Sequence, residues 1–206
     1  NFIVCGKMSK FGQLVDACRT TGEYNFLSLK GGKFLIPGEI KKRFWKYFLR
    51  GLTQGDDFNL VYVPPDDTHF PLTIDMDIIS QSEQISSERL SGLVLAAVDA
   101  VCTVTGVFDE LTVCALRKPS FTTRNDGQQK FGCHVFVHGV LVTRHMATQI
   151  RQHFLDMEFT KEFCEEFDVT QPSELWDDSV APVGKNGLLL ALQKKKDRVQ
   201  HYACFF

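Results

Sequence analysis

The sequence of 206 residues lacks the features that mark several common classes of protein. It has no Cys-x-x-Cys pair, no apolar run long enough to span a bilayer, and no secretory hydrophobic segment. Internal repeats and low-complexity tracts are also absent. These absences exclude a zinc ribbon, a membrane-spanning protein and a repeat protein. We expect a compact intracellular domain with no zinc site within these residues and no membrane partner.

The residues that are present favour a packed core. The sequence is 44% hydrophobic, and its 18 Phe residues often stand beside Leu, Val or Ile, which favours burial over a base-stacking surface. The seven cysteines are odd in number and lie mostly within apolar stretches, so we expect reduced, buried thiols. Both ends of the sequence are abrupt, and we expect a fragment of a larger polypeptide.

Charge is balanced over the whole sequence but uneven along it. A formal net charge of −2 excludes a uniformly basic coat. Positive charge is concentrated in three stretches, which are Lys41, Lys42, Arg43, Lys46 and Arg50; Arg117, Lys118, Arg124 and Lys130; and Lys194, Lys195, Lys196 and Arg198. Such stretches are compatible with an anionic partner beside an acidic site.

Strands and helices alternate along the sequence, which predicts an α+β fold with mixed sheets and helices packed against them. We place helices at residues 8–18, 39–52, 86–101, 143–157 and 160–167. We place strands at residues 24–29, 33–37, 59–63, 72–79, 110–116, 130–140, 187–192 and 199–206, with a polar loop at 119–129. The polar connection at residues 53–69 indicates a boundary between an N-terminal module, residues 1–66, and a second module, residues 67–206.

The strand expected at residues 72–79 carries two carboxylates on one face. Alternation sends Thr73, Asp75 and Asp77 to one side of the strand and the apolar residues between them to the other. Adjacent like charges repel, and a divalent cation removes that cost. Hard oxygen ligands suit Mg²⁺ or Mn²⁺, and two such ions about 3.5–4 Å apart support phosphoryl transfer. A solvent-facing edge strand explains the same pattern without a metal.

A second strand has the side chains of an anion site. In residues 130–137, alternation sets Lys130, Gly132 and His134 on one face. An ammonium and an imidazole can donate to phosphate oxygens, and a glycine between them lets a phosphate approach the backbone. A histidine on a strand is more often a core or surface residue, and His138 fits that description.

A third region adds a carboxylate before a strand and cations after it. Asp177 and Asp178 follow Trp176, and Lys185 and the lysine cluster at 194–196 flank the apolar residues 188–192. A solvated loop explains these residues equally well when they are considered alone.

Taken in order, these three elements resemble the motifs of the archaeo-eukaryotic primase (AEP) superfamily, in the branch that contains primases of large DNA viruses and eukaryotic primase-polymerases. Its motifs are a D-x-D or D-x-E strand, an S-x-H strand often preceded by lysine, and an aspartate after a hydrophobic residue, followed by a strand and basic residues. The likeness covers roughly residues 22–206 and is greatest to the primase part of poxvirus- and asfarvirus-type primase-helicases.

The resemblance implies a primase-polymerase fold with an RRM-like catalytic module. It implies that Asp75, Asp77 and Asp177 bind catalytic Mg²⁺ or Mn²⁺ ions. The nucleotide-binding residues that it implies are Lys130, Gly132, His134, Lys185, Lys194 and Lys196. The implied reaction makes primers from nucleoside triphosphates on a single-stranded DNA template, through attack of a 3′-hydroxyl on the α-phosphate. A helicase domain or subunit is the implied partner, at sites of DNA replication inside the cell.

Two departures from the family pattern leave alternatives open. Gly132 stands where the family usually has serine. Leu189 or Leu190 stands where many members have an arginine that binds the nucleotide, so Lys185 or a lysine at 194–196 would have to replace that arginine. We choose Asp177 over its neighbour Asp178 because it follows Trp176 directly and stands three residues before Val180. A nucleic-acid-binding module with a decayed active site and a metal-dependent nuclease are the alternative functions.

Overall fold

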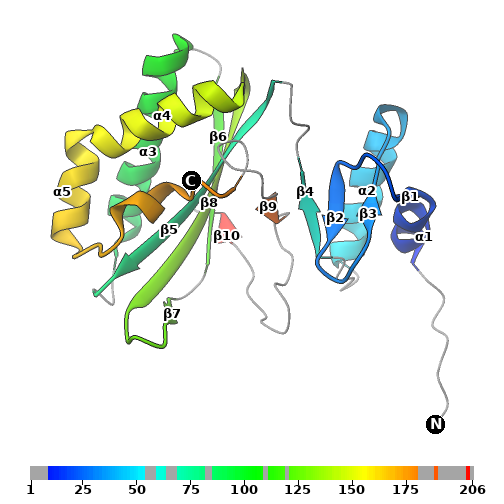
Figure 1. The fold of residues 1–206 in the computed structure, drawn as a ribbon, viewed down its shortest axis with the longest axis horizontal. Helices are drawn as coiled ribbons and strands as arrows, with labels where there is room; N and C mark the ends of the chain where they lie inside the picture. Colours follow the sequence, from blue (N-terminus) through cyan, green and yellow to red (C-terminus); the bar gives the residue numbers. More distant parts are fainter. Residues whose placement is uncertain are drawn as a thin grey trace. The chain divides into compact units, whose positions relative to one another are not determined.

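The computed structural model describes residues 9–53, 59–63, 69–81, 85–108, 111–118, 121–180, 188–189 and 203–204. The chain divides into two compact units (Figure 1). The first contains residues 1–63 and 189–200, and the second contains residues 64–188 and 201–206. Both units combine helices with antiparallel strands, so the α+β class is confirmed.

The first unit has a small sheet and a core of aromatic rings. Its elements are α1 (Lys10–Ala17), β1 (Arg19–Thr20), β2 (Phe26–Ser28), β3 (Lys33–Phe34), the 3₁₀ helix η1 (Gly38–Ile40), α2 (Lys41–Thr53) and β4 (Leu60–Tyr62). The strand order is β1-β3-β2-β4-β9, where β9 is Leu188–Leu189. Phe11, Phe26 and Phe44 are at most 3% exposed and lie with ring centroids 5.0–5.3 Å apart in adjacent pairs. The expected hairpin is confirmed, because β2 pairs antiparallel with β3.

The second unit is built on a larger antiparallel sheet. Its elements are β5 (Phe70–Ser80), α3 (Ser87–Thr105), β6 (Thr112–Arg117), β7 (Thr122–Thr123), β8 (Gln129–Val142), α4 (Arg144–Asp156), α5 (Glu158–Glu166), the 3₁₀ helix η2 (Pro172–Trp176) and β10 (Ala203–Cys204). The strand order is β10-β6-β8-β5, and β7 pairs with β8. Polar side chains begin the helices as the sequence predicts: the Ser86 hydroxyl accepts from Arg89 N at α3, and the Thr143 hydroxyl accepts from Met146 N at α4.

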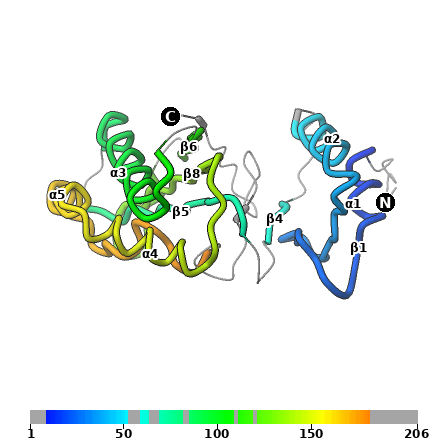
Figure 2. The backbone as a smooth tube through the Cα atoms, turned by 90° about the horizontal axis from the view of Figure 1, so that it is seen from above, coloured from blue at the N-terminus to red at the C-terminus, as the bar shows by residue number. Residues whose placement is uncertain are grey.

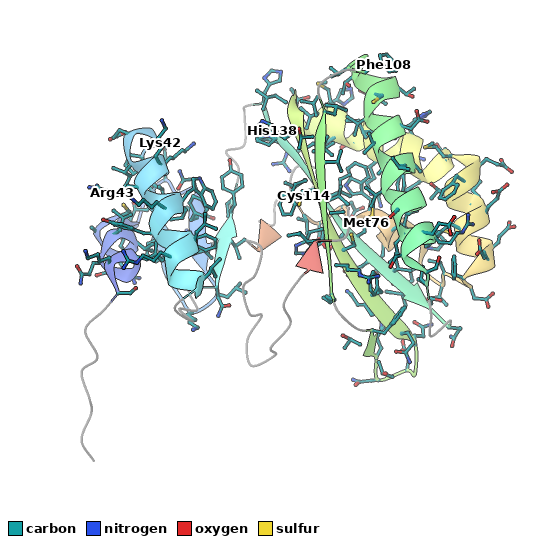
Figure 3. The ribbon with its side chains drawn as sticks, turned by 180° about the vertical axis from the view of Figure 1, so that it is seen from behind. Lys42, Arg43, Met76, Phe108, Cys114 and His138 are labelled. Carbon is teal, nitrogen blue, oxygen red and sulfur yellow. The ribbon has the colours of Figure 1, made fainter. Side chains whose placement is uncertain are left out.

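The helices α3, α4 and α5 cover one face of this sheet (Figures 1 and 2). The alternate residues Leu72, Ile74, Met76 and Ile78 of β5 are at most 1% exposed and join the apolar sides of the helices in one core (Figure 3 labels Met76). Because side chains alternate along a strand, burying these residues turns the polar residues of β5 to the opposite face. The core thereby fixes which face carries the polar residues.

The sheet differs from the expected one in two ways. All strand pairs whose register the structure describes are antiparallel, whereas the sequence analysis predicted mixed sheets. An RRM-like module has the strand order 4-1-3-2, and here β5, β8 and β6 keep the 1-3-2 part. The last strand, β10, pairs with β6 instead of lying beside β5. Residues 169–177, which include η2, lie along the outer edge of β5. This segment begins with a bridge between Val169 and Ser80.

No helix within the described ranges has both the length and the apolar character that crossing a membrane requires. Among the cysteines whose side chains the structure describes, Cys133 is buried as expected. Cys18, Cys102, Cys114 and Cys164 are only partly buried, which differs from the expected buried thiols.

Candidate nucleotidyl-transfer site

The face of the sheet opposite the helices brings the first two predicted motifs together. In the antiparallel pairing of β5 with β8, Asp75 lies opposite His134 and Asp77 lies opposite Gly132. Lys130 stands two residues before Gly132 on β8, so its side chain lies on the same face. Residues 53 or more positions apart in sequence are therefore neighbours across two paired strands.

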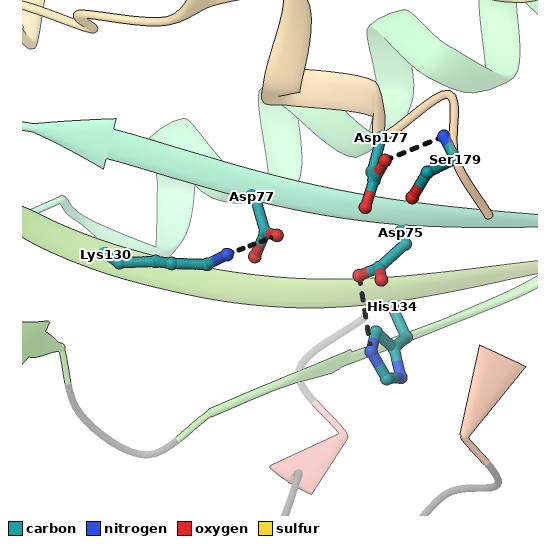
Figure 4. Close-up of polar contacts among 6 residues, drawn as sticks. All are labelled: Asp75, Asp77, Lys130, His134, Asp177 and Ser179. Atoms are coloured by element: carbon teal, nitrogen blue, oxygen red, sulfur yellow. Dashed lines mark hydrogen bonds and ion pairs between the residues drawn. The ribbon is translucent and has the colours of Figure 1, made fainter. Parts of the chain in front are cut away.

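Each carboxylate contacts a different cationic or donor side chain (Figure 4). Nζ of Lys130 lies 2.6 Å from Oδ2 of Asp77, and Nε2 of His134 lies 3.3 Å from Oδ1 of Asp75. His134 is only 5% exposed, and the side chains of Asp75 and Asp77 are 20% and 15% exposed. These contacts are partly withdrawn from water, which strengthens the electrostatic interaction.

The two aspartates differ in their acidity. Burial raises the pKa of Asp77, and the negative charge of Asp75 raises it further; the hydrogen bond and charge of Lys130 and the charge of Lys118 offset only part of this. Burial also acts to raise the pKa of Asp75, but the hydrogen bond and charge of His134, with the charges of Lys118 and Lys130, outweigh it and leave that pKa lowered. The site thus favours one full negative charge at Asp75 and penalises the second at Asp77.

The third predicted residue, Asp177, reaches β5 through the irregular segment at its edge. The backbone N–H of Thr170 donates to the Ile79 carbonyl at 2.9 Å, and the backbone N–H of Asp177 donates to the Asp75 carbonyl at 2.8 Å. The Asp177 carboxylate accepts from the Ser179 backbone N–H at 2.8 Å (Figure 4). Its neighbour Asp178 is 67% exposed and lies 3.6 Å from Arg151. Of the two candidates, Asp177 is the one beside the Asp75 backbone.

Two contacts hold the segment that carries Asp177. Trp176 is 1% exposed, and its ring packs 5.9 Å from that of Phe154 on α4. Arg151, also on α4, donates from Nε to the Trp176 carbonyl and from a terminal nitrogen to the Ser173 carbonyl, both at 2.8 Å. Arg151 was not among the residues expected at the site. An arginine on an amphipathic helix gives no local signal that its partners are backbone carbonyls 22 and 25 positions away.

Lys118 is a second residue that the sequence analysis did not place in the site. Its backbone N–H donates to the Gly132 carbonyl at 3.1 Å, one register step beyond the pair Arg117 and Cys133. A side-chain carbon built on Gly132 would lie 2.9 Å from both Cε and Nζ of Lys118. The lysine side chain therefore lies over the glycine. The sequence showed Lys118 only as part of a basic stretch, because the pairing of β6 with β8 is not encoded locally.

The donor set fits a hard divalent cation, although the described side chains are not arranged around one. Within the described part of the chain, no three His, Cys, Asp or Glu side chains form a group that could hold a metal ion. Asp75 and Asp77 nevertheless supply carboxylate oxygens, which Mg²⁺ and Mn²⁺ prefer, and burial together with the repulsion from Asp75 raises the Asp77 pKa. A cation beside them would remove that repulsion, at the expense of the Lys130 contact with Asp77.

The predicted basic residues after this segment, Lys185, Lys194 and Lys196, lie outside the described residues. The same holds for Leu190, whereas Leu189 belongs to β9.

A protein-family model described as the C962R protein N-terminal AEP domain matches residues 25–204. The match includes the second unit through residue 204, the first unit from residue 25 onward, and all three motifs. A comparison with curated proteins finds no match.

Proposed function

Because the chain belongs to the AEP superfamily, in the family of the N-terminal domain of C962R, a viral primase-helicase, we propose that it is the catalytic domain of a DNA primase or primase-polymerase. It would make primers from nucleoside triphosphates on single-stranded DNA. The observation that carries this function is the row of Asp75 and Asp77 beside Lys130 and His134 on one sheet face. Acidic groups for cations and basic groups for phosphates are what nucleotidyl transfer requires.

Asp75, Asp77 and Asp177 are the residues that would hold Mg²⁺ or Mn²⁺. Such an ion, when bound, neutralises the charge that develops on phosphate oxygens. Asp177 supports this role through its backbone bond to Asp75, which limits how far the two residues can separate. The segment held by Arg151 and Trp176 thereby positions the third carboxylate.

Lys130 and His134 would bind the phosphates of the incoming nucleotide, with Gly132 between them. Lys185, Lys194 and Lys196 would add further cations. The 3′-hydroxyl of a primer or initiating nucleotide attacks the α-phosphate, and pyrophosphate leaves. The side chains contribute positioning and charge neutralisation, and none acts as a covalent nucleophile. We further propose that the domain binds a single-stranded DNA template and works with a helicase domain or subunit. It would act at sites of DNA replication inside the cell.

Primer synthesis on single-stranded DNA, with Mg²⁺ and Mn²⁺ and with ribo- and deoxynucleotides, tests this function. We expect Asp77→Asn to abolish synthesis, because it removes a carboxylate oxygen and the charge that would attract the cation. Asp99→Asn is the control, since Asp99 is exposed on α3, away from the polar face of the sheet. Unchanged synthesis by the Asp77 variant would contradict the proposed function.

A nucleic-acid-binding module without catalysis is the second candidate. The ion pair of Lys130 with Asp77 favours it, because a carboxylate already neutralised by an ammonium has less to gain from a cation. Calorimetry with Mn²⁺ and a nucleoside triphosphate separates the two functions. A primase binds the two ligands cooperatively, whereas the module binds single-stranded DNA and shows no coupled binding.

A further inference from the structure

Gly132 occupies the centre of a cross-strand row on the polar face of the sheet. On one side its register partner is Asp77 of β5, and on the other its carbonyl accepts from the Lys118 backbone N–H. Across the sheet the order is Asp77 on β5, Gly132 on β8 and Lys118 directly after the end of β6. Any side chain at position 132 would stand between the carboxylate and the lysine.

The Lys118 side chain uses the space that the glycine leaves. A carbon built on Gly132 would be 2.9 Å from Nζ and Cε and 3.4 Å from Cδ of Lys118. The two shorter distances are below ordinary van der Waals contact, so a larger residue would displace the lysine. The backbone conformation at Gly132 does not demand glycine, but the observed path of Lys118 depends on the absence of a side chain there.

The position of Lys118 puts its charge next to the carboxylate pair. Its ammonium acts electrostatically on both Asp75 and Asp77, as does that of Lys130. Lys130 reaches the pair from β8, and Lys118 reaches it from the end of β6 across Gly132. Two ammonium groups on different strands therefore flank the residues that would hold the cation.

We propose that Lys118 binds the triphosphate of the incoming nucleotide, taking the place of the hydroxyl donor that a serine at position 132 would supply. This inference rests on the proposed primase function and deepens it. An ammonium is a stronger partner for a phosphate oxygen than a neutral hydroxyl, because the hydrogen bond is charge-assisted. Glycine at position 132 offers no donor of its own, and the space above it admits this stronger group.

Lys118→Met tests the role of the ammonium, because methionine keeps most of the apolar length of the side chain and removes only the charge. We expect the KM for the nucleoside triphosphate in primer synthesis to rise about tenfold, with a smaller change in kcat. Binding of a fluorescent nucleoside triphosphate with Mn²⁺ should weaken by the same factor. Lys118→Arg should keep most of the affinity, and the exposed Lys161→Ala should behave as wild type.

Gly132→Ser gives a second, independent test. The atoms that crowd position 132 are at the flexible end of Lys118, so the serine should displace the lysine without unfolding the sheet. We expect Gly132→Ser alone to raise KM. In the Lys118→Met background the same substitution should leave KM unchanged, or lower it by restoring part of the nucleotide affinity through the serine hydroxyl. KM increases that multiply in the double variant would show that the two positions act independently and would overturn the inference.

A purely structural role for Lys118 predicts a different result. If the lysine only balances the buried aspartates, Lys118→Met lowers the melting temperature and leaves KM and nucleotide binding unchanged. That outcome, in a wild-type chain that makes primers, overturns the role of Lys118 and leaves the primase function standing. A wild-type chain that neither makes primers nor binds nucleoside triphosphate with Mn²⁺ overturns both.

Discussion

Asp75 and Asp77 have the same chemistry and stand two positions apart, yet the fold treats their charges differently. The pKa of Asp75 is lowered and that of Asp77 is raised. A residue whose charge is disfavoured by its own fold is typical of functional sites, where ligands are expected to supply the missing compensation. Substitutions of the two aspartates should therefore have different effects on stability, although the proposed function requires both carboxylates.

We expect Asp75→Asn to destabilise the protein near pH 7 by roughly 2 kcal/mol, because it removes a charge-assisted hydrogen bond with His134. A lowered pKa means that the Asp75 contribution is present above the ordinary carboxyl pKa and is lost as the pH falls through the lower value in the folded state. The difference between this variant and wild type should thus shrink in acid. Denaturant unfolding at several pH values measures it.

We expect the opposite sign for Asp77→Asn. A raised pKa means that folding favours the protonated form of Asp77, so stability is lost as the pH rises through the raised value. The amide variant cannot ionise, and it should equal or exceed wild type in stability near pH 7 while failing in primer synthesis. Asp99→Asn again serves as the control, because Asp99 is exposed on α3. A strongly destabilised Asp77→Asn protein would contradict this assignment.

The sequence of a strand encodes which of its residues share a face, but not which residues of another strand lie opposite them. Alternation within one strand is local, so the shared faces of Asp75 with Asp77 and of Lys130 with His134 could be predicted. Which residue lies opposite which depends on register between strands that are far apart in sequence. Lys118 lies beside Gly132 because of that register, and no local sequence pattern predicts this position.

At the scale of elements, the segment at residues 169–177 decides where the third carboxylate lies. Its anchor is α4, which supplies the Arg151 guanidinium to two backbone carbonyls and the Phe154 ring to Trp176. A planar guanidinium can reach both carbonyls at once, and a lysine ammonium has no such fork. Asp177 therefore depends on a helix that carries no proposed catalytic residue.

We expect Arg151→Lys to reduce kcat about tenfold or more, because the Asp177 segment loses one of its two backbone contacts and shifts relative to Asp75. The affinity for Mn²⁺ should fall, while the KM for the nucleotide changes less. Gln149→Ala, at an exposed position of the same helix, is the matched control. A normal kcat and normal Mn²⁺ affinity in Arg151→Lys would show that Asp177 is held by other contacts.

Most elements could be predicted because hydrophobic periodicity is strong in β5, α3 and β8. The strand and helix at residues 70–80 and 87–105 match the expected ranges to within a few residues. The antiparallel direction of the described strand pairs could not be predicted, because alternation does not report the direction of a neighbouring strand. The packing of residues 169–177 along β5 could not be predicted either, since an irregular segment has no periodicity.

At the scale of the whole molecule, a net charge of −2 conceals a strong separation of charge. Helix α2 carries five cations and no acidic residue, whereas α5 carries four glutamates and one lysine. The burial of Phe44 and Phe48 turns the cations of α2 outward, with Trp45 41% exposed among them (Figure 3 labels Lys42 and Arg43). Cations beside an exposed aromatic ring are the features that bind a single-stranded nucleic acid, because the cations attract its phosphates and its bases stack on the ring.

We therefore expect the exposed face of α2 to bind the single-stranded template through its phosphates. The double variant Lys42→Ala with Lys46→Ala should weaken binding of a single-stranded oligonucleotide. It should also reduce the slope of log affinity against log salt by about 1.4, which corresponds to two lost phosphate contacts. Lys10→Ala with Lys161→Ala removes the same charge from exposed positions on α1 and α5 and controls for the general field. Equal losses of affinity in both double variants would mean that net charge, and not the α2 face, determines binding. A loss confined to the α2 variant, with an unchanged KM for the nucleotide, would assign the template to this helix.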